Sequence, residues 1–179
     1  MQRVVFLPAV MAIISATVAL TSGVAAQEMS PPTEIGSARH REPRSGTTLD
    51  YPRSLFSSRV GPSRRGTGER FVTDDGRAVL SIYSLPAARG STPASLVRNN
   101  VQSLTTWLSR GSDLRRVHYK RVTGRFFALS AVRSGRIFYT RCNLGRTRTI
   151  HCFEVSYPAK EKRAWDRPVT RMSHSLGSG

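Results

Sequence analysis

The sequence contains little lysine, few acidic residues and only two cysteines. Lysine supplies 3 of the 28 basic residues, and there are 11 aspartates and glutamates. The shortage of acids leaves a formal net charge of +17, which attracts polyanions and raises their rate of encounter. GC-rich coding, which favours arginine over lysine, would give a similar composition, and the basic residues are spread along the whole chain. Two interpretations therefore stay open: a polyanion-binding surface and a compositional bias.

Only one long apolar segment is present, close to the N-terminus. Arg3 precedes an uncharged run from Val4 to Leu20, and Val24-Ala25-Ala26 then supplies the small residues that a signal peptidase recognises. We predict that residues 1–26 are a cleavable signal peptide. The run is at the short limit for a membrane span, so an N-terminal anchor is the alternative. After cleavage we expect no stable membrane insertion and a periplasmic or secreted location.

Removing this leader changes the charge only slightly. The leader holds one arginine and no acid, so 27 basic residues remain against 11 acidic ones, a formal +16.

Residues 27–46 are rich in Pro, Ser, Arg and Glu, and they have too few apolar groups to offset the entropy of ordering. We predict a disordered linker over 27–46 and a single domain over 47–179.

The two cysteines, Cys142 and Cys152, are an even pair in a chain predicted to be exported. In an oxidising compartment such a pair predicts a disulfide. A metal site formed by Cys142, His151 and Cys152 is the alternative. Adjacent residues of a strand point to opposite faces, which makes it difficult for His151 and Cys152 to reach one ion. We therefore expect no metal site and no cofactor.

The hydrophobic pattern predicts an α+β domain. Asp74-Asp75-Gly76 between two apolar strands is typical of a hairpin turn. The predicted strands cover residues 47–51, 69–73, 77–83, 117–123, 126–132, 136–143 and 149–157. The first helix should run over residues 94–108, with Thr92 as N-cap and Pro93 in the first turn. A second should run over residues 159–175, kinked or restarted at Pro168 with Asp166 as a local cap.

Pairing Cys142 with Cys152 fixes the register of the last hairpin. Arg141 would then lie opposite Phe153, and Tyr139 opposite Val155. Carrying the alternation to residues 126–132 makes both faces of the central strands largely apolar, which an antiparallel sheet with one solvated face would not show. We therefore expect an antiparallel sheet of about six or seven strands with one helix packed on each face.

Several stretches resemble a known fold group. They are Asp50-Tyr51-Pro52, the segment from Ser81 to Pro86, the segment from Glu161 to Asp166, and the closing helix pattern of Trp165, Val169, Met172 and Leu176. This order of elements over residues 47–176 resembles the Mog1/PsbP-like fold group, including the exported DcrB-like proteins, and small secreted proteobacterial proteins. The resemblance implies a binding or accessory role, while a shared fold does not by itself fix function.

Motifs for catalysis are sparse. There is no Gly-x-Ser-x-Gly sequence for a nucleophile elbow. A small secreted hydrolase acting on phosphodiesters would need Glu154 as base, with His118 or His151 as acid. Gly66-Thr67-Gly68 follows Arg64-Arg65 and could hold a phosphate on its backbone amides. No strand is predicted before it and no helix after it, so loop flexibility better explains these glycines.

Basic residues alternate with aromatic ones in two regions, which suits stacking and anion contact. The candidate anion-binding residues are Arg115, Arg116, Lys120, Arg121, Arg141, Arg146 and Arg148. Ordinary strand alternation, with arginine outward and aromatics inward, would produce a similar pattern. We expect an exported, non-enzymatic binding or accessory protein, whose partner is an anionic envelope polymer or an acidic protein. The hydrolase is the alternative, and the sequence indicates no oligomeric state.

Overall fold

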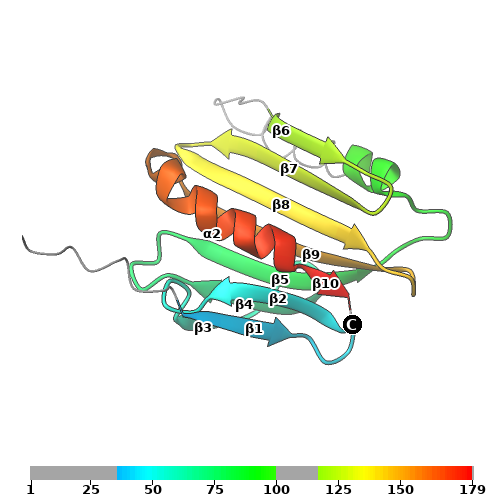
Figure 1. Ribbon diagram of the computed structural model, residues 1–179, viewed down its shortest axis with the longest axis horizontal. Coiled ribbons are helices and arrows are strands. Elements are labelled where there is room, and N and C mark those ends of the chain that lie inside the picture. The colour runs from blue at the N-terminus through cyan, green and yellow to red at the C-terminus, as the bar shows by residue number, and fades with distance from the viewer. Residues whose placement is uncertain (1–35, 100–116, 179) are drawn as a thin grey trace, which may run out of the picture. The chain divides into compact units, whose positions relative to one another are not determined.

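The computed structural model describes residues 36–99 and 117–178, all within one compact unit. Its centre is a seven-stranded antiparallel sheet with the order β3-β4-β5-β9-β8-β7-β6 (Figure 1). The strands are β3 (Ser58–Pro62), β4 (Thr67–Val72), β5 (Val79–Pro86), β6 (Val117–Val122), β7 (Phe126–Arg133), β8 (Arg136–Leu144) and β9 (Thr149–Pro158). The predicted α+β class and strand number are confirmed.

A second, three-stranded sheet has the order β1-β2-β10. Its strands are β1 (Ser37–Arg41), β2 (Thr47–Pro52) and β10 (Gly177–Ser178). The prediction of a disordered linker is wrong for residues 36–46, since β1 pairs with β2 along its whole length. The buried Glu42 carboxylate accepts hydrogen bonds from the backbone N–H groups of Arg44 and Ser45, which fixes the turn after β1. Residues 27–35 lie outside the described part.

The last helix continues through its proline. A short 3₁₀ turn, η1 (Ala159–Glu161), leads into α2 (Lys162–Ser175). Pro168 lies inside α2, and the N-cap of this helix is Glu161. The prediction of Asp166 as a local cap is therefore wrong. The Asp166 carboxylate instead pairs with the Lys162 ammonium group at 2.9 Å. The missing N–H of Pro168 removes one backbone hydrogen bond, and packing of the buried residues Trp165, Val169 and Met172 holds the helix in place.

One face of the large sheet carries the main core. Phe153 and Val155 of β9 pack there with residues of α2 and with Leu49 and Tyr51 of β2. In Figure 1, α2 crosses this face beside the small sheet. On the other face, Val97 packs with Tyr83, Phe127 and the disulfide. Burial on both faces agrees with the apolar pattern of the central strands.

The first helix is described only at its beginning. Residues 93–99 are helical, and the Thr92 hydroxyl accepts a hydrogen bond from the N–H of Ser95, so the predicted N-cap is confirmed. The rest of the helix predicted over 94–108 lies outside the described residues, so one helix on each face stays a prediction. Within ranges 36–99 and 117–178, no helix is long and apolar enough to cross a membrane.

Both outermost strands of the large sheet are irregular. The pairing of β3 with β4 shifts its register between Arg59 and Gly61, and Pro62 follows at the end of β3. The pairing of β6 with β7 shifts its register between Val117 and Tyr119. Such bulges twist an edge strand and interrupt its row of free backbone groups.

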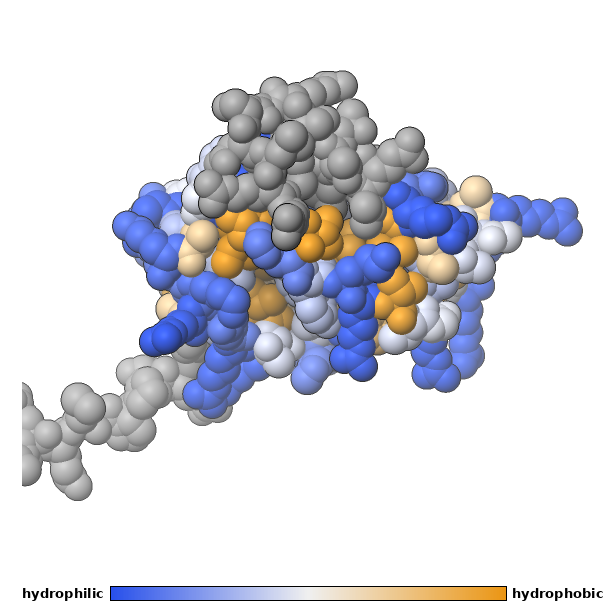
Figure 2. Space-filling model, turned by 90° about the horizontal axis from the view of Figure 1, so that it is seen from above, coloured by the Kyte–Doolittle hydropathy of each residue, from blue (hydrophilic) through white to orange (hydrophobic). Residues whose placement is uncertain are grey.

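Seen from above the view of Figure 1, the described surface combines hydrophilic and hydrophobic side chains. Figure 2 shows long hydrophilic side chains that project around the rim, with hydrophobic surface exposed between them. On this side of the molecule, hydrophilic side chains therefore lie next to exposed hydrophobic surface.

Candidate anion-binding groove beside α2

A groove runs between α2 and the strands β6, β7 and β8. The helix contacts β9 and β2, and it leaves the same face of these three strands less covered. The groove has a volume of about 390 Å³. Its α2 wall is one helical face, since its residues recur at spacings of three and four. That wall is formed by Lys162, Asp166, Val169, Thr170, Ser173 and His174.

Two arginines meet on the sheet side of this groove. Arg121 of β6 lies opposite Ala128 of β7, and Ala128 lies opposite Arg141 of β8. The three residues form one row across the sheet, so both arginines extend on the same side. Ala128 is the small member in the middle, and its methyl group leaves space between the two longer side chains. We call this site the Arg141 groove.

Phe126 is the platform for both guanidinium groups. The Cζ atom of Arg141 lies 3.9 Å from the centre of the Phe126 ring, and that of Arg121 lies 5.6 Å from it. A cation over an aromatic face is attracted by the ring quadrupole. The ring therefore holds two positive charges close together that would otherwise repel each other.

Hydrogen bonds fix the orientation of Arg141. Its Nη1 donates to the Ser173 hydroxyl of α2 at 2.9 Å, and its Nε donates to the Asn143 side-chain oxygen at 3.3 Å. The Tyr139 hydroxyl also contacts Ser173, at 3.0 Å. Strand β8 and helix α2 thus hold this guanidinium from two sides.

No acid among the described residues forms an ion pair with Arg121 or Arg141. In the part of the chain that the structure describes, neither arginine forms an ion pair, and the nearby Asp166 is paired with Lys162. Burial, with the positive charge of Arg121 adding to it, lowers the pKa of Arg141, and burial raises the pKa of Tyr139. A partly desolvated cation without a counter-charge gains free energy when an anion binds to it.

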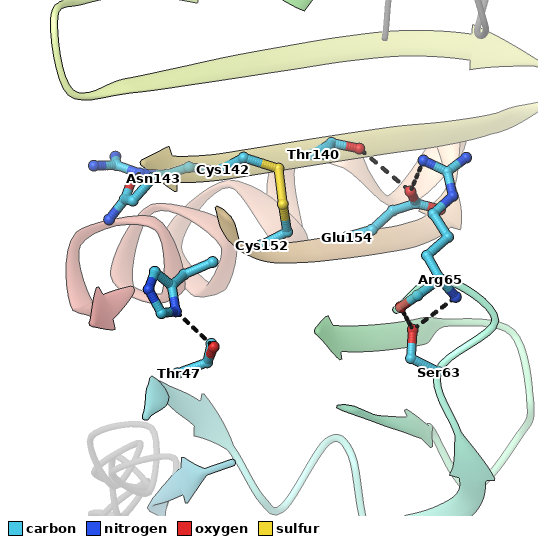
Figure 3. The surroundings of a disulfide bond; sticks show 10 residues. Thr47, Ser63, Arg65, Thr140, Cys142, Asn143, Cys152 and Glu154 are labelled. Atoms are coloured by element: carbon cyan, nitrogen blue, oxygen red, sulfur yellow. Dashed lines mark hydrogen bonds and ion pairs between the residues drawn. A yellow bond between two sulfur atoms is a disulfide. The ribbon is translucent and has the colours of Figure 1, made fainter. Parts of the chain in front are cut away.

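The disulfide lies on the other face of the sheet. Cys142 and Cys152 are joined and stand opposite each other in the β8–β9 pair, as the register argument predicted (Figure 3). The disulfide is therefore confirmed, and the thiolates of the alternative metal site are not available. Sequence separation of 10 makes it a short covalent loop between two neighbouring strands.

The residues of the alternative hydrolase are not brought together. His151 is buried, and its Nδ1 lies 2.7 Å from the Thr47 hydroxyl on β2. Glu154 lies three positions further along β9 and therefore faces the opposite side, where Figure 3 shows it beside Thr140 and Arg65. His118 is an exposed residue of β6.

Solved structures show which fold this is. The sequence matches no family model and no curated protein. The structure is similar to cyanobacterial PsbP (CyanoP) from Synechocystis sp. PCC 6803, with a TM-score of 0.63 over 81% of this chain and 94% of that one, at 12% identity. It has the Mog1/PsbP-like fold.

Two Mog1 structures support the same conclusion. The Ran-binding protein Mog1p of Saccharomyces cerevisiae is similar with a TM-score of 0.55 over 80% of this chain and 95% of that one, at 11% identity. A point mutant of Mog1 matches over 80% of this chain and 96% of that one, at 10% identity and a TM-score of 0.55. At this identity the likeness establishes the Mog1/PsbP-like fold and carries no binding partner with it.

The Mog1/PsbP-like fold separates the predicted anion-binding residues. It brings Arg121 and Arg141 together, whereas Lys120, one position from Arg121 and opposite Leu129, belongs to the other face of the sheet. Arg146 and Arg148 are exposed in the β8–β9 turn. Arg115 and Arg116 lie outside the described residues. The role of these four arginines in anion binding stays a prediction.

Sequence reasoning named Phe126 as an aromatic neighbour of the basic residues, but it did not assign Ala128 or Ser173 to a site. The register set by the disulfide, carried along the strand alternation to residues 126–132, placed Ala128 on the face opposite the disulfide without marking it as a site residue. Phe126 lies diagonally from Arg141, and the reach of its ring depends on side-chain torsions that the pattern does not encode. Ser173 comes from α2, whose position on the sheet is a tertiary property.

Proposed function

We propose that this protein is an exported, non-catalytic binding protein, which holds an anionic envelope polymer in the Arg141 groove. The proposal depends on one observation above all: Arg121 and Arg141 share the Phe126 ring without an acidic partner among the described residues. Two oriented guanidinium groups match the negatively charged groups of a polymer. The aromatic side chains Tyr119 and Tyr139 in the same groove offer apolar surface between the charges.

Export is supported by two independent features. The first 26 residues have the pattern of a cleavable signal peptide. Disulfides such as Cys142–Cys152 persist in oxidising compartments and are rare in the cytosol. A periplasmic or secreted location would bring the protein into contact with lipopolysaccharide and acidic polysaccharide. A net charge of +16 after cleavage would speed the encounter with either polymer.

Binding across a range of salt concentrations tests this function. We expect the affinity for lipopolysaccharide or acidic polysaccharide to fall steeply between about 50 and about 200 mM salt, because bound counterions are released on association. Arg141→Met should weaken binding about tenfold, which corresponds to the loss of one charge-assisted contact, and should reduce the salt slope by about one. Affinity measured at each salt concentration by fluorescence titration gives both quantities.

Arg171→Met is the matched control. Arg171 is an exposed residue of α2 that does not line the groove, and its replacement removes the same charge. If both variants weaken binding equally, net charge and not the groove drives association. Tight binding to an acidic protein alone, with neither polymer bound, would also overturn the proposal.

A further inference from the structure

A second basic site lies on the opposite face of the sheet from the Arg141 groove. Arg70 of β4 is opposite Ser81 of β5, and Ser81 is opposite Glu154 of β9. The loop between β3 and β4 adds Ser63, Arg64 and Arg65 to the rim. Together these residues surround a depression of about 450 Å³, which we call the Arg70 basin.

Two glycines hold the arginine loop against the sheet. A Cβ atom on Gly66 would come within 2.0 Å of the Ser84 carbonyl oxygen, and one on Gly68 within 2.0 Å of the Ile82 carbonyl oxygen. The backbone N–H of Ser63 donates to the carbonyl of Gly68 at 2.9 Å and closes the loop. Gly66 and Gly68 therefore permit close packing on β5, and flexibility does not explain them. This packing brings Arg64 and Arg65 to the basin.

Among the described residues, the one acid lining the basin is already engaged. Glu154 pairs with Arg65 at 3.4 Å and accepts a hydrogen bond from the Thr140 hydroxyl (Figure 3). The side chain of Tyr83 lines the basin beside them. Three arginines against one glutamate leave two positive charges in excess, and these belong to Arg64 and Arg70.

Arg70 brings a buried donor without a partner among the described residues to the wall of the basin. Its Nε is buried and has no hydrogen-bond partner within the described structure. A buried donor without a partner carries its full desolvation penalty, and this is larger for a charged group. An anion in the basin would place acceptor oxygens beside the Arg70 guanidinium group, and the Ser81 hydroxyl, opposite Arg70 in the β4–β5 pair, could bind a second oxygen of the same ligand.

We infer that the Arg70 basin binds a phosphate group. Arg64 approaches from the rim loop and Arg70 from the sheet, so their donors come from different directions. A tetrahedral dianion offers oxygens in several directions and its charge equals the excess in the basin, whereas a carboxylate has one charge and two oxygens in a plane. The site is separate from the Arg141 groove, because Thr140 and Arg141 are neighbours on β8 that face opposite sides.

The experiment is a titration of the full chain with inorganic phosphate at about pH 8, with sodium acetate at the same ionic strength as reference. We expect phosphate to raise the melting temperature and acetate to leave it unchanged, since a ligand that binds only the folded state stabilises it. Sulfate, a tetrahedral dianion, should compete with phosphate. Equal shifts with phosphate and acetate would overturn the inference.

Variants locate the site. Arg70→Met should remove the phosphate-dependent rise and weaken binding about tenfold or more, and Arg64→Met, at an exposed position, should weaken it at least about threefold without affecting folding. Arg171→Met, which removes the same charge elsewhere, should behave as the parent. A full phosphate response in both Arg64→Met and Arg70→Met would contradict the assignment.

Arg141→Met separates this site from the proposed function. It should weaken polymer binding about tenfold and keep the whole phosphate response. If the polymers fail to bind while phosphate still raises the melting temperature through Arg70, only the function of the Arg141 groove is refuted. If phosphate has no effect while polymer binding depends on Arg141, only the Arg70 basin is refuted.

Discussion

Ala128 lies directly opposite Arg141, and this pairing of a small residue with a long one makes room for the guanidinium group over Phe126. Ala128 is almost completely buried, whereas Arg141 is half-buried. A larger residue at position 128 would occupy the space between Arg121 and Arg141. The groove therefore requires a small side chain at position 128 as well as the two arginines.

Replacing the aromatic platform should weaken anion binding without removing any charge. In Phe126→Leu both arginines remain, but they lose the ring that orients them. A cation–π contact at a partly exposed site contributes about 0.5–1 kcal/mol, so we expect a two- to fivefold weaker affinity for the polymer. Fluorescence titration at constant salt measures this loss. Unchanged affinity would show that the ring does not position the arginines for binding.

Removing the disulfide should destabilise the fold. For a loop closed by a sequence separation of 10, the chain-entropy model gives a loss of about 2–3 kcal/mol in the free energy of unfolding for the Cys142→Ser, Cys152→Ser double variant. Urea unfolding of the oxidised protein and of this variant provides the comparison. A thiol assay on the folded, unreduced protein should find no free thiol. Equal unfolding midpoints would contradict a stabilising role.

The buried His151 should make stability fall in mild acid. Burial lowers its pKa below the ordinary value of 6.5, so between that value and the lowered one the unfolded chain binds more protons than the folded one. Stability is then complete above about pH 6.5 and decreases as the pH falls below it, by at most about 1.4 kcal/mol for each unit of pKa difference. His40, whose pKa is also lowered by burial, should act in the same direction.

His151→Asn should reduce this acid sensitivity, measured as the difference in unfolding free energy between about pH 7 and about pH 5. The variant His174→Asn, at an exposed position of α2, is the control and should retain the full difference. An undiminished pH dependence in His151→Asn would mean that other groups cause it.

Two glycine variants separate close packing from backbone strain. Gly66 and Gly76 both have positive φ, +60° and +65°, but only at Gly66 would a Cβ meet neighbouring atoms. Gly76→Ala should cost about 1–2 kcal/mol, the usual penalty for a left-handed residue with a side chain. Gly66→Ala should cost clearly more and should also weaken phosphate binding, because Arg64 and Arg65 would move. Thermal unfolding compares the two, and equal losses would argue against close packing.

The sequence predicted those elements whose pairing is local or fixed by the cysteines. The register of β8 with β9 followed from Cys142 and Cys152, and the strand alternation carried it to β7. The strands β1 and β3 were missed for a physical reason. The sequence Ser-Ala-Arg-His-Arg lacks an apolar face, and Gly61 and Pro62 disfavour a strand. Both form because a neighbouring strand supplies hydrogen bonds to their backbones.

For the two sites, the sequence indicated which types of residue take part, but it did not show which residues lie next to one another in the fold. The basic clusters around Arg121 and Arg141 were visible in the sequence, and strand pairing then joined these two and turned Lys120 away. Nothing in the spacing linked Arg70 to the Arg64-Arg65 pair, since their approach depends on how Gly66 and Gly68 seat the loop on β5. Local sequence patterns therefore identify candidate charged residues, while tertiary packing determines which of these residues lie close together.

The irregular outer strands have a consequence for how this protein behaves at high concentration. A flat, regular edge would accept a strand from a second molecule and start a continuous intermolecular sheet. The register shifts at Arg59–Gly61 and Val117–Tyr119, with Pro62 on one rim and Lys120 and Arg121 on the other, interrupt this template at both ends. Crowded molecules would therefore meet at bent, interrupted strand edges, which favours dispersal over fibre growth.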